Sequence, residues 1–144
     1  MNLFGMLELS GSALGAERQR AEVVASNMAN AQTTRTAAGG PYRRQLVVFQ
    51  AQRVPRFQFA LAGVQRETSS AVRIAAVLND ARPPVLRFEP GHPDADKQGY
   101  VAYPQVDPVE EMTDLLGAVR AYELNASAVQ ATKNMIQQSL DLLR

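Results

Sequence analysis

Residues 107–143 read DPVEEMTDLLGAVRAYELNASAVQATKNMIQQSLDLL, and this stretch decides the fold. Apolar side chains recur in it at steps of three and four residues, and Lys133 occupies the one skipped position. Such spacing places them on one stripe of a helix, at the a and d positions of a heptad repeat. The stripe comprises Met112, Leu115, Val119, Tyr122, Ala126, Val129, Ile136, Leu140 and Leu143. The sequence therefore predicts one long C-terminal helix with an apolar seam.

The start of this helix carries the usual signals. Asp107 is suited to cap the helix, Pro108 suits its first position, and Glu110 stands at the third. Glu110, Glu111 and Asp114 place negative charge near the positive end of the helix dipole. We expect the helix to run from about Pro108 to Leu143.

A weaker stripe marks a second helix at the N-terminus. It comprises Leu3, Leu7, Leu14, Ala21, Val24, Met28 and Ala31. Gly11 and Gly15 each lower the helix propensity by roughly 1 kcal/mol relative to Ala, so this helix is expected to need a partner. It should end near Asn27–Asn30, where Asn30 suits the left-handed conformation of a helix end.

The middle of the chain reads as short strands separated by Pro and Gly. The candidate strands are residues 45–50, 56–61, 71–77 and 85–88. The expected fold class is α+β: long N- and C-terminal helices pair as a coiled-coil-like unit, and a small β-rich domain is inserted between them. The boundaries are 1–35 for the first helix, 36–104 for the linker and β-rich part, and 105–144 for the last helix.

Composition excludes several classes of function. The 144 residues include no cysteine and one histidine, so disulfides, thiolate metal sites and two-His metal motifs are absent. No apolar run reaches the ~18 residues of a membrane span. The first residues lack the positive charge that opens a Sec-type signal peptide, so none is expected.

The sequence gives little evidence for a metal-binding or catalytic site. The pattern His92-x-Asp94-x-Asp96 could be taken for a metal cluster, but it fits better as a surface turn whose Asp side chains accept backbone N–H groups. Serines occur at positions 10, 12, 69 and 70 without a nucleophile-elbow motif. We expect no enzyme activity, no cofactor and no small-molecule substrate.

Residues 36–104 are basic, with nine Arg or Lys against five Asp or Glu. A nucleic-acid site would need this charge interleaved with aromatic residues on one face. Phe57 and Phe59 alternate on a candidate strand and are expected to point into a core instead. The arginines, including Arg43, Arg44, Arg53 and Arg73, fit a solvated strand face or contact with acidic neighbours, and we expect no nucleic acid.

Each end of the chain thus carries an apolar seam, and neither seam has a large globular body to pack on. An exposed apolar seam is typical of an interaction surface. The residues alone therefore predict a self-associating or partner-binding protein. Two alternatives stay open: the seam is an ordinary core face, or the chain is a stand-alone coiled-coil module that folds by itself.

Four blocks of sequence resemble the FlgC type of bacterial flagellar basal-body proximal rod protein. Residues 25–35, ASNMANAQTTR, are similar to the signature that flagellar rod and hook proteins share, with Met28 in place of Leu. The other blocks are residues 40–49, 89–101 and 104–133; Gln105 and Leu124 depart from the pattern, and residues 53–80 match no fixed motif. The positions that carry the resemblance are Asn27, Asn30, Ala31, Tyr42, Arg43, Pro90, Gly91, His92, Pro93, Gly99, Tyr100, Val101, Asp107, Glu111, Met112, Arg120, Tyr122, Asn125 and Lys133.

The resemblance implies a structural subunit that assembles with itself and with sibling rod subunits through its terminal helices. These helices would surround the central export channel and help to transmit torque. The resemblance also implies export in unfolded form through the flagellar type III export apparatus, without a cleaved signal, into the periplasmic rod. Asn27 and Asn30 are expected to fix the turn after the first helix, and residues 91–96 are candidate outer contacts. Another axial protein of the same flagellum is the nearest alternative.

Overall fold

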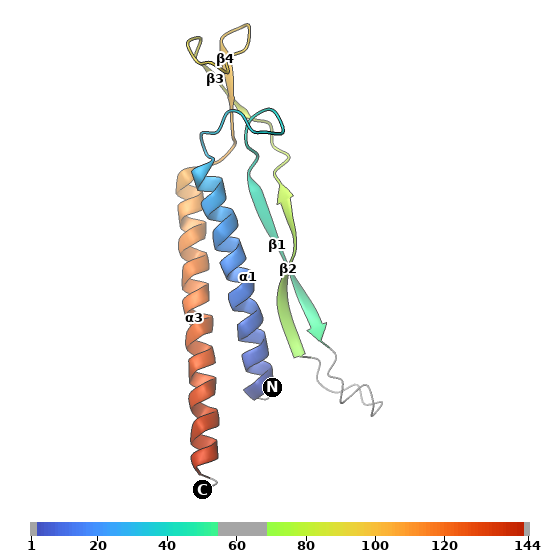
Figure 1. Ribbon diagram of the computed structural model, residues 1–144, viewed down its shortest axis with the longest axis vertical. Helices are drawn as coiled ribbons and strands as arrows, with labels where there is room; N and C mark the ends of the chain where they lie inside the picture. The colour runs from blue at the N-terminus through green and yellow to red at the C-terminus, as the bar shows by residue number, and fades with distance from the viewer. Residues whose placement is uncertain (1–2, 55–68, 143–144) are drawn as a thin grey trace. The chain divides into compact units, whose positions relative to one another are not determined.

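A computed structural model describes residues 3–54 and 69–142 (Figure 1). Its elements, in chain order, are α1 (Leu3–Ala29), β1 (Gln45–Val54), β2 (Ser69–Asn79), β3 (Val85–Phe88), β4 (Tyr100–Tyr103) and α3 (Pro108–Asp141). Among the described residues, two helices and two small antiparallel sheets confirm the α+β class. The predicted strand at residues 56–61 and the seam residue Leu143 lie outside the described residues.

Helix α3 begins where its capping signals predict. The Asp107 carboxylate accepts a hydrogen bond from Val109 N (2.9 Å), and the Asp107 carbonyl accepts one from Glu111 N (3.0 Å). The first bond satisfies a donor that the first helical turn leaves open, which is typically worth about 1 kcal/mol, and the second is the first regular backbone bond of the helix. Asp107 is therefore the N-cap, and Pro108 is the first helical residue.

Helix α1 ends inside the predicted interval, and Asn30 shapes its end. The Asn30 side-chain amide donates to the Ser26 carbonyl (2.9 Å), and its side-chain oxygen accepts from the Thr33 hydroxyl (3.1 Å). Thr33 N also donates to the Asn30 carbonyl (3.0 Å). Asn30 thus closes the last turn of the helix and holds the turn that follows it.

Each sheet has two strands. β1 pairs with β2, and their arrows run in opposite directions in Figure 1. β3 pairs antiparallel with β4 in the register Val85↔Tyr103 to Phe88↔Tyr100. The hydrophobic pattern predicted β3 to the residue and most of β1 and β2, but β4 was not identified as a separate strand.

The chain divides into two compact units. Unit 1 comprises Met1–Gln19, Val48–Ala76 and Gly117–Arg144; unit 2 comprises Arg20–Val47 and Val77–Leu116. In unit 1, the Ser12 hydroxyl accepts a hydrogen bond from Val72 N (3.0 Å) and donates to the Leu9 carbonyl (2.7 Å). Ser12 thereby joins α1 to β2.

None of the described helices combines the length and apolar character that a membrane span requires.

The buried part of the described chain is small and unusually polar. Its buried apolar side chains are Ala16, Val24, Val101, Pro104 and Ala118. Its buried polar ones are Asn27, Arg44, Glu111 and Thr132. Buried polar groups cost free energy unless they are hydrogen-bonded, so these four side chains mark positions that the fold holds specifically.

Candidate functional site

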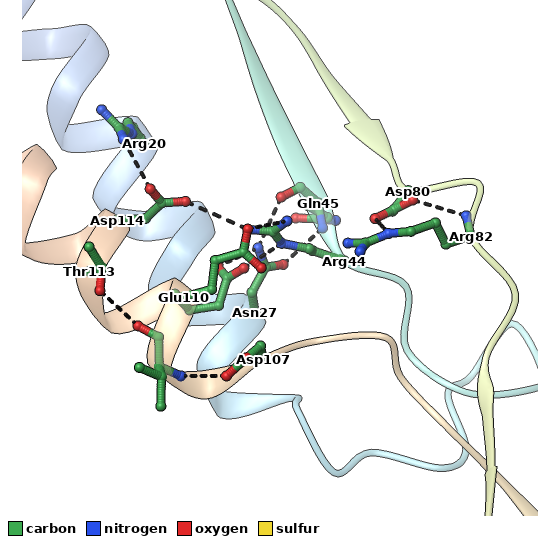
Figure 2. Close-up of polar contacts among 12 residues, drawn as sticks. Arg20, Asn27, Arg44, Gln45, Asp80, Arg82, Asp107, Glu110, Thr113 and Asp114 are labelled. Carbon is green, nitrogen blue, oxygen red and sulfur yellow. Dashed lines mark hydrogen bonds and ion pairs between the residues drawn. The ribbon is translucent and has the colours of Figure 1, made fainter.

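A buried polar cluster joins both helices of unit 2 to the start of β1, and we call it the polar node. It consists of Asn27, Tyr42, Arg44, Gln45, Glu110, Glu111 and Asp114, several of which appear in Figure 2.

Asn27 is the centre of the polar node and is 1% exposed. Its side-chain amide donates to the Gln45 carbonyl (2.9 Å) and to the Glu111 carboxylate (3.0 Å). Its side-chain oxygen accepts from Gln45 N (2.9 Å) and from the Tyr42 hydroxyl (2.9 Å). Both donors and both acceptor positions of the amide are therefore used. One side chain from α1 thus fixes the position of β1 and of the first turn of α3.

Arg44 supplies the positive charge of the polar node. Its Nε hydrogen-bonds and pairs with the buried Glu111 carboxylate, while its terminal nitrogens lie 3.6 Å from oxygens of Glu110 and Asp114. Arg20, on α1, lies 3.5 Å from the other Asp114 oxygen. Burial alone would lower the pKa of Arg44, but the hydrogen bond and the nearby carboxylates outweigh it and raise the pKa. Arg44 therefore remains cationic.

The position of Arg44 corrects one sequence interpretation. The sequence predicts for both Arg43 and Arg44 a solvated strand face or contact with acidic neighbours, but only Arg43 is exposed, and Arg44 is 8% exposed and pairs with acidic residues of its own chain. Arg73 of the same predicted face donates to Gln50 (2.8 Å), and Arg82, before β3, pairs with Asp80 (2.6 Å). The Arg82 contacts hold the pKa of Asp80 below its usual range.

The side chains of residues 92–96 serve the loop between β3 and β4. The His92 ring nitrogen Nδ1 accepts from Asp94 N (3.1 Å), and Asp96 accepts from the backbone of Gln98 and Tyr100 (both 2.8 Å). Asp94 accepts from the Thr34 hydroxyl (2.8 Å) and lies 3.6 Å from Arg35. No metal-binding group of these side-chain types occurs within residues 3–54 and 69–142.

Helix α3 carries its large apolar residues mostly outward. Its buried column, Glu111, Ala118 and Thr132, lies one residue N-terminal to Met112, Val119 and Lys133 of the predicted repeat. One residue corresponds to a rotation of about 100° around the helix axis. Two of the three residues that the described part of α3 buries within the chain, Glu111 and Thr132, are thus polar.

The predicted seam residues fall into three groups. Met112, Val119, Tyr122 and Leu140 are exposed; Leu3, Leu7, Leu14, Met28, Leu115, Val129 and Ile136 are partly buried; and Val24 is buried within the chain. Four exposed apolar residues of α3 are spaced three, four and three residues apart, and we call them the outer row. They are Val109 (73% exposed), Met112 (55%), Leu116 (54%) and Val119 (43%). Sequence reasoning missed Val109 and Leu116, which lie off the heptad positions.

The positions that carry the family resemblance fall in several places. Asn27, Tyr42 and Glu111 belong to the polar node, and Asn30 and Asp107 shape helix ends. Gly99, Tyr100 and Val101 lead into and form β4, while Arg120 and Lys133 are exposed on α3. The structure thus does not bring them together at one place.

Comparisons with known proteins match this chain to flagellar rod proteins over its whole length. Residues 7–35 match the family described as "Flagella basal body rod protein", and residues 97–142 match "Flagellar basal body rod FlgEFG protein C-terminal". The chain is 39% identical to the flagellar basal-body rod protein FlgC of Borreliella burgdorferi, over 100% of this chain and 99% of the relative. It is 38% identical to FlgC of Bacillus subtilis (99% of each chain) and 37% identical to FlgC of Salmonella typhimurium (99% and 98%).

Proposed function

The chain belongs to the FlgC family of flagellar basal-body rod proteins, and we propose that neighbouring rod subunits cover the outer row of α3 when it assembles. As a member of this family it is a structural subunit of the proximal rod, and it acts in motility together with other rod subunits. The proposal concerns the surface through which it does so.

The proposal rests on which side chains α3 exposes and which it buries. A helix that has finished packing exposes its polar side, whereas α3 exposes Val109, Met112, Leu116 and Val119 and buries Glu111. Complete burial of one such apolar side chain is worth about 1.5–3 kcal/mol. Covering the outer row therefore offers several kcal/mol per subunit, which is enough to direct assembly once several subunits contribute.

The polar node suits the same role. In the proposed subunit, residues 1–35 and 105–144 form an inner helical layer in which the helices pair, surround the export channel and help to transmit torque. Residues 36–104 form the outer part. The bonds of Asn27 and Arg44 support this arrangement, because they tie α1, the start of β1 and the start of α3 to one another.

The proposed route to the rod is export in unfolded form through the flagellar type III apparatus, without a cleaved signal, into the periplasmic rod. The small apolar core of the described chain supports it, since a chain with little buried apolar area unfolds at modest cost. The proposed role is structural and needs neither catalysis nor a cofactor.

The outer row is tested by complementation. A strain lacking its own FlgC receives the chain with Met112→Ser and Leu116→Ser, and the matched control receives Ser139→Ala, an exposed residue that lies about 140° around the axis of α3 from Leu116. The double variant is expected to accumulate and be exported but to give few complete basal bodies and little swimming. Normal swimming by the double variant would refute the proposal.

A further inference from the structure

The segment that follows α1 contacts the loop between β3 and β4, at positions that are 60 residues apart in the sequence. The Thr34 hydroxyl donates to Oδ2 of Asp94 (2.8 Å), and a terminal nitrogen of Arg35 lies 3.6 Å from Oδ1 of the same carboxylate. These three residues belong to unit 2. Both oxygens of Asp94 are therefore used by the segment after α1.

The segment that carries Thr34 is itself held at the end of α1. On one side of Thr34, the backbone and the hydroxyl of Thr33 both bond to Asn30, the residue that closes the last turn of the helix. On the other side, Thr36 N donates to the Gly40 carbonyl (2.9 Å) and closes a short turn. Thr34 therefore has a defined position relative to α1.

Asp94 is in turn fixed to the hairpin, by which we mean β3, β4 and the loop that joins them. Asp94 N donates to Nδ1 of His92 (3.1 Å), and Ala95 N donates to the His92 carbonyl (3.0 Å). The His92 ring meets the ring of Tyr103, the last residue of β4, edge to face with centroids 6.4 Å apart. Asp94 is thus joined to both the loop and β4.

We infer that Asp94 is a positioning residue that holds the hairpin in one direction relative to the end of α1. Val101 of β4 is completely buried, but burial of an apolar side chain has no preferred direction. A hydrogen bond to a carboxylate is short and directional, so it fixes both a distance and an angle. The bond between Thr34 and Asp94 therefore sets the direction of the hairpin, whereas Val101 contributes to its stability.

The direction of the hairpin decides where its exposed side chains point. Leu86 and Phe88 lie on the same side of β3 and are 63% and 64% exposed. The hairpin continues into the rest of unit 2 through residues 80–84 and 104–107, which form neither helix nor strand. Loss of the bond to Asp94 is therefore expected to let the hairpin turn at these two segments while its strands stay paired.

Distance measurement between two spin labels tests this role, because the chain has no cysteine of its own. The labels are attached to Ala25→Cys on α1 and Leu86→Cys on β3, both of which are exposed positions. Double electron–electron resonance on the full chain should give one narrow distance distribution. Asp94→Ala and Thr34→Val should each at least double its width. Their combination should broaden it no further, because both remove the same hydrogen bond.

Two control variants separate the hydrogen bond from a general effect of charge. Asp141→Ala removes an exposed carboxylate at the end of α3 and should leave the width unchanged. Asp94→Asn removes the charge but keeps a side-chain oxygen that accepts from the Thr34 hydroxyl, so it should restore most of the narrow distribution. Circular dichroism of each labelled variant shows that the helices remain folded.

Three results would overturn the inference. They are an unchanged width in both Asp94→Ala and Thr34→Val, broadening in Asp94→Ala without broadening in Thr34→Val, and equal broadening in Asp141→Ala. If Asp94→Ala does not fold, Thr34→Val decides alone, because it keeps every charge and nearly the same side-chain volume. None of these positions belongs to the outer row, so the result is independent of the proposed function.

Discussion

Replacing Arg44 by Ala isolates the energetic role of the polar node. The substitution leaves the Glu111 carboxylate, which is completely buried, without its cation. Breaking a buried ion pair by removing one partner costs about 3–5 kcal/mol, because an uncompensated charge remains buried. The contacts of Arg44 with Glu110 and Asp114 add little, since those carboxylates are partly exposed to water.

The chain supplies its own control for this experiment. Arg43→Ala removes the neighbouring arginine, which is exposed, and should change the free energy of unfolding by no more than about 0.5 kcal/mol. A third variant, Arg44→Met with Glu111→Leu, removes both charges and should cost much less than Arg44→Ala. Its remaining cost comes from Asn27, whose amide loses one acceptor.

The assay is thermal and denaturant unfolding of the purified chain, followed by circular dichroism at neutral pH. For a chain of this size, 1 kcal/mol shifts the midpoint temperature by roughly 2–4 °C, so Arg44→Ala should lower it by about 10 °C. If Arg44→Ala and Arg43→Ala have equal effects, the reasoning about the buried pair is refuted. A double variant as unstable as Arg44→Ala would refute the explanation through an unpaired charge.

Three further predictions concern other positions. Asn27→Ala removes four hydrogen bonds and should destabilise the chain by about 2–4 kcal/mol in the same unfolding assay; a change below about 1 kcal/mol would contradict the central place of Asn27. Gly99→Ala forces a side chain into a left-handed backbone and against Phe88, so it should lower the unfolding midpoint, and an unchanged midpoint would refute the close contact. The hydrogen bond to Glu89 and burial raise the pKa of Tyr103, so this interaction is present at neutral pH and is lost as alkaline pH ionises the ring. Glu89→Gln should therefore make Tyr103 titrate at lower pH in absorbance at 295 nm, compared with a Tyr103→Phe reference, and an unshifted titration would exclude this cause.

Local chemistry explains why some elements could be predicted. Asp107 and Pro108 mark a helix start with groups that act within one turn, and the structure confirms both. Residues 85–88 form a mostly apolar run between Pro84 and Pro90, and this local pattern predicted β3 correctly for the same reason. Such signals depend only on residues close in the sequence, so they can be recognised before the fold is known.

Both the polar node and the choice of which side of α3 is buried depend on partners that are distant in the sequence. Met112 and Glu111 are adjacent, and the apolar period placed Met112 on the seam, whereas the chain itself buries Glu111. The cause is Arg44, which is 67 residues away. Nothing local distinguishes Arg44 from Arg43. The spacing of apolar residues shows only which side chains share a helix face. It therefore cannot predict a buried ion pair between residues that are distant in the sequence.

Labelling of Leu116→Cys measures directly whether rod assembly covers the outer row of α3, since the chain has no other thiol. A maleimide reagent is applied to the free chain and to isolated basal bodies, and the labelled fraction is read by mass. Denaturation before labelling shows that the thiol is intact. We expect rapid labelling of the free chain, because Leu116 is 54% exposed, and at least tenfold slower labelling in basal bodies. Equal labelling rates in both would contradict the claim that rod assembly covers the outer row of α3.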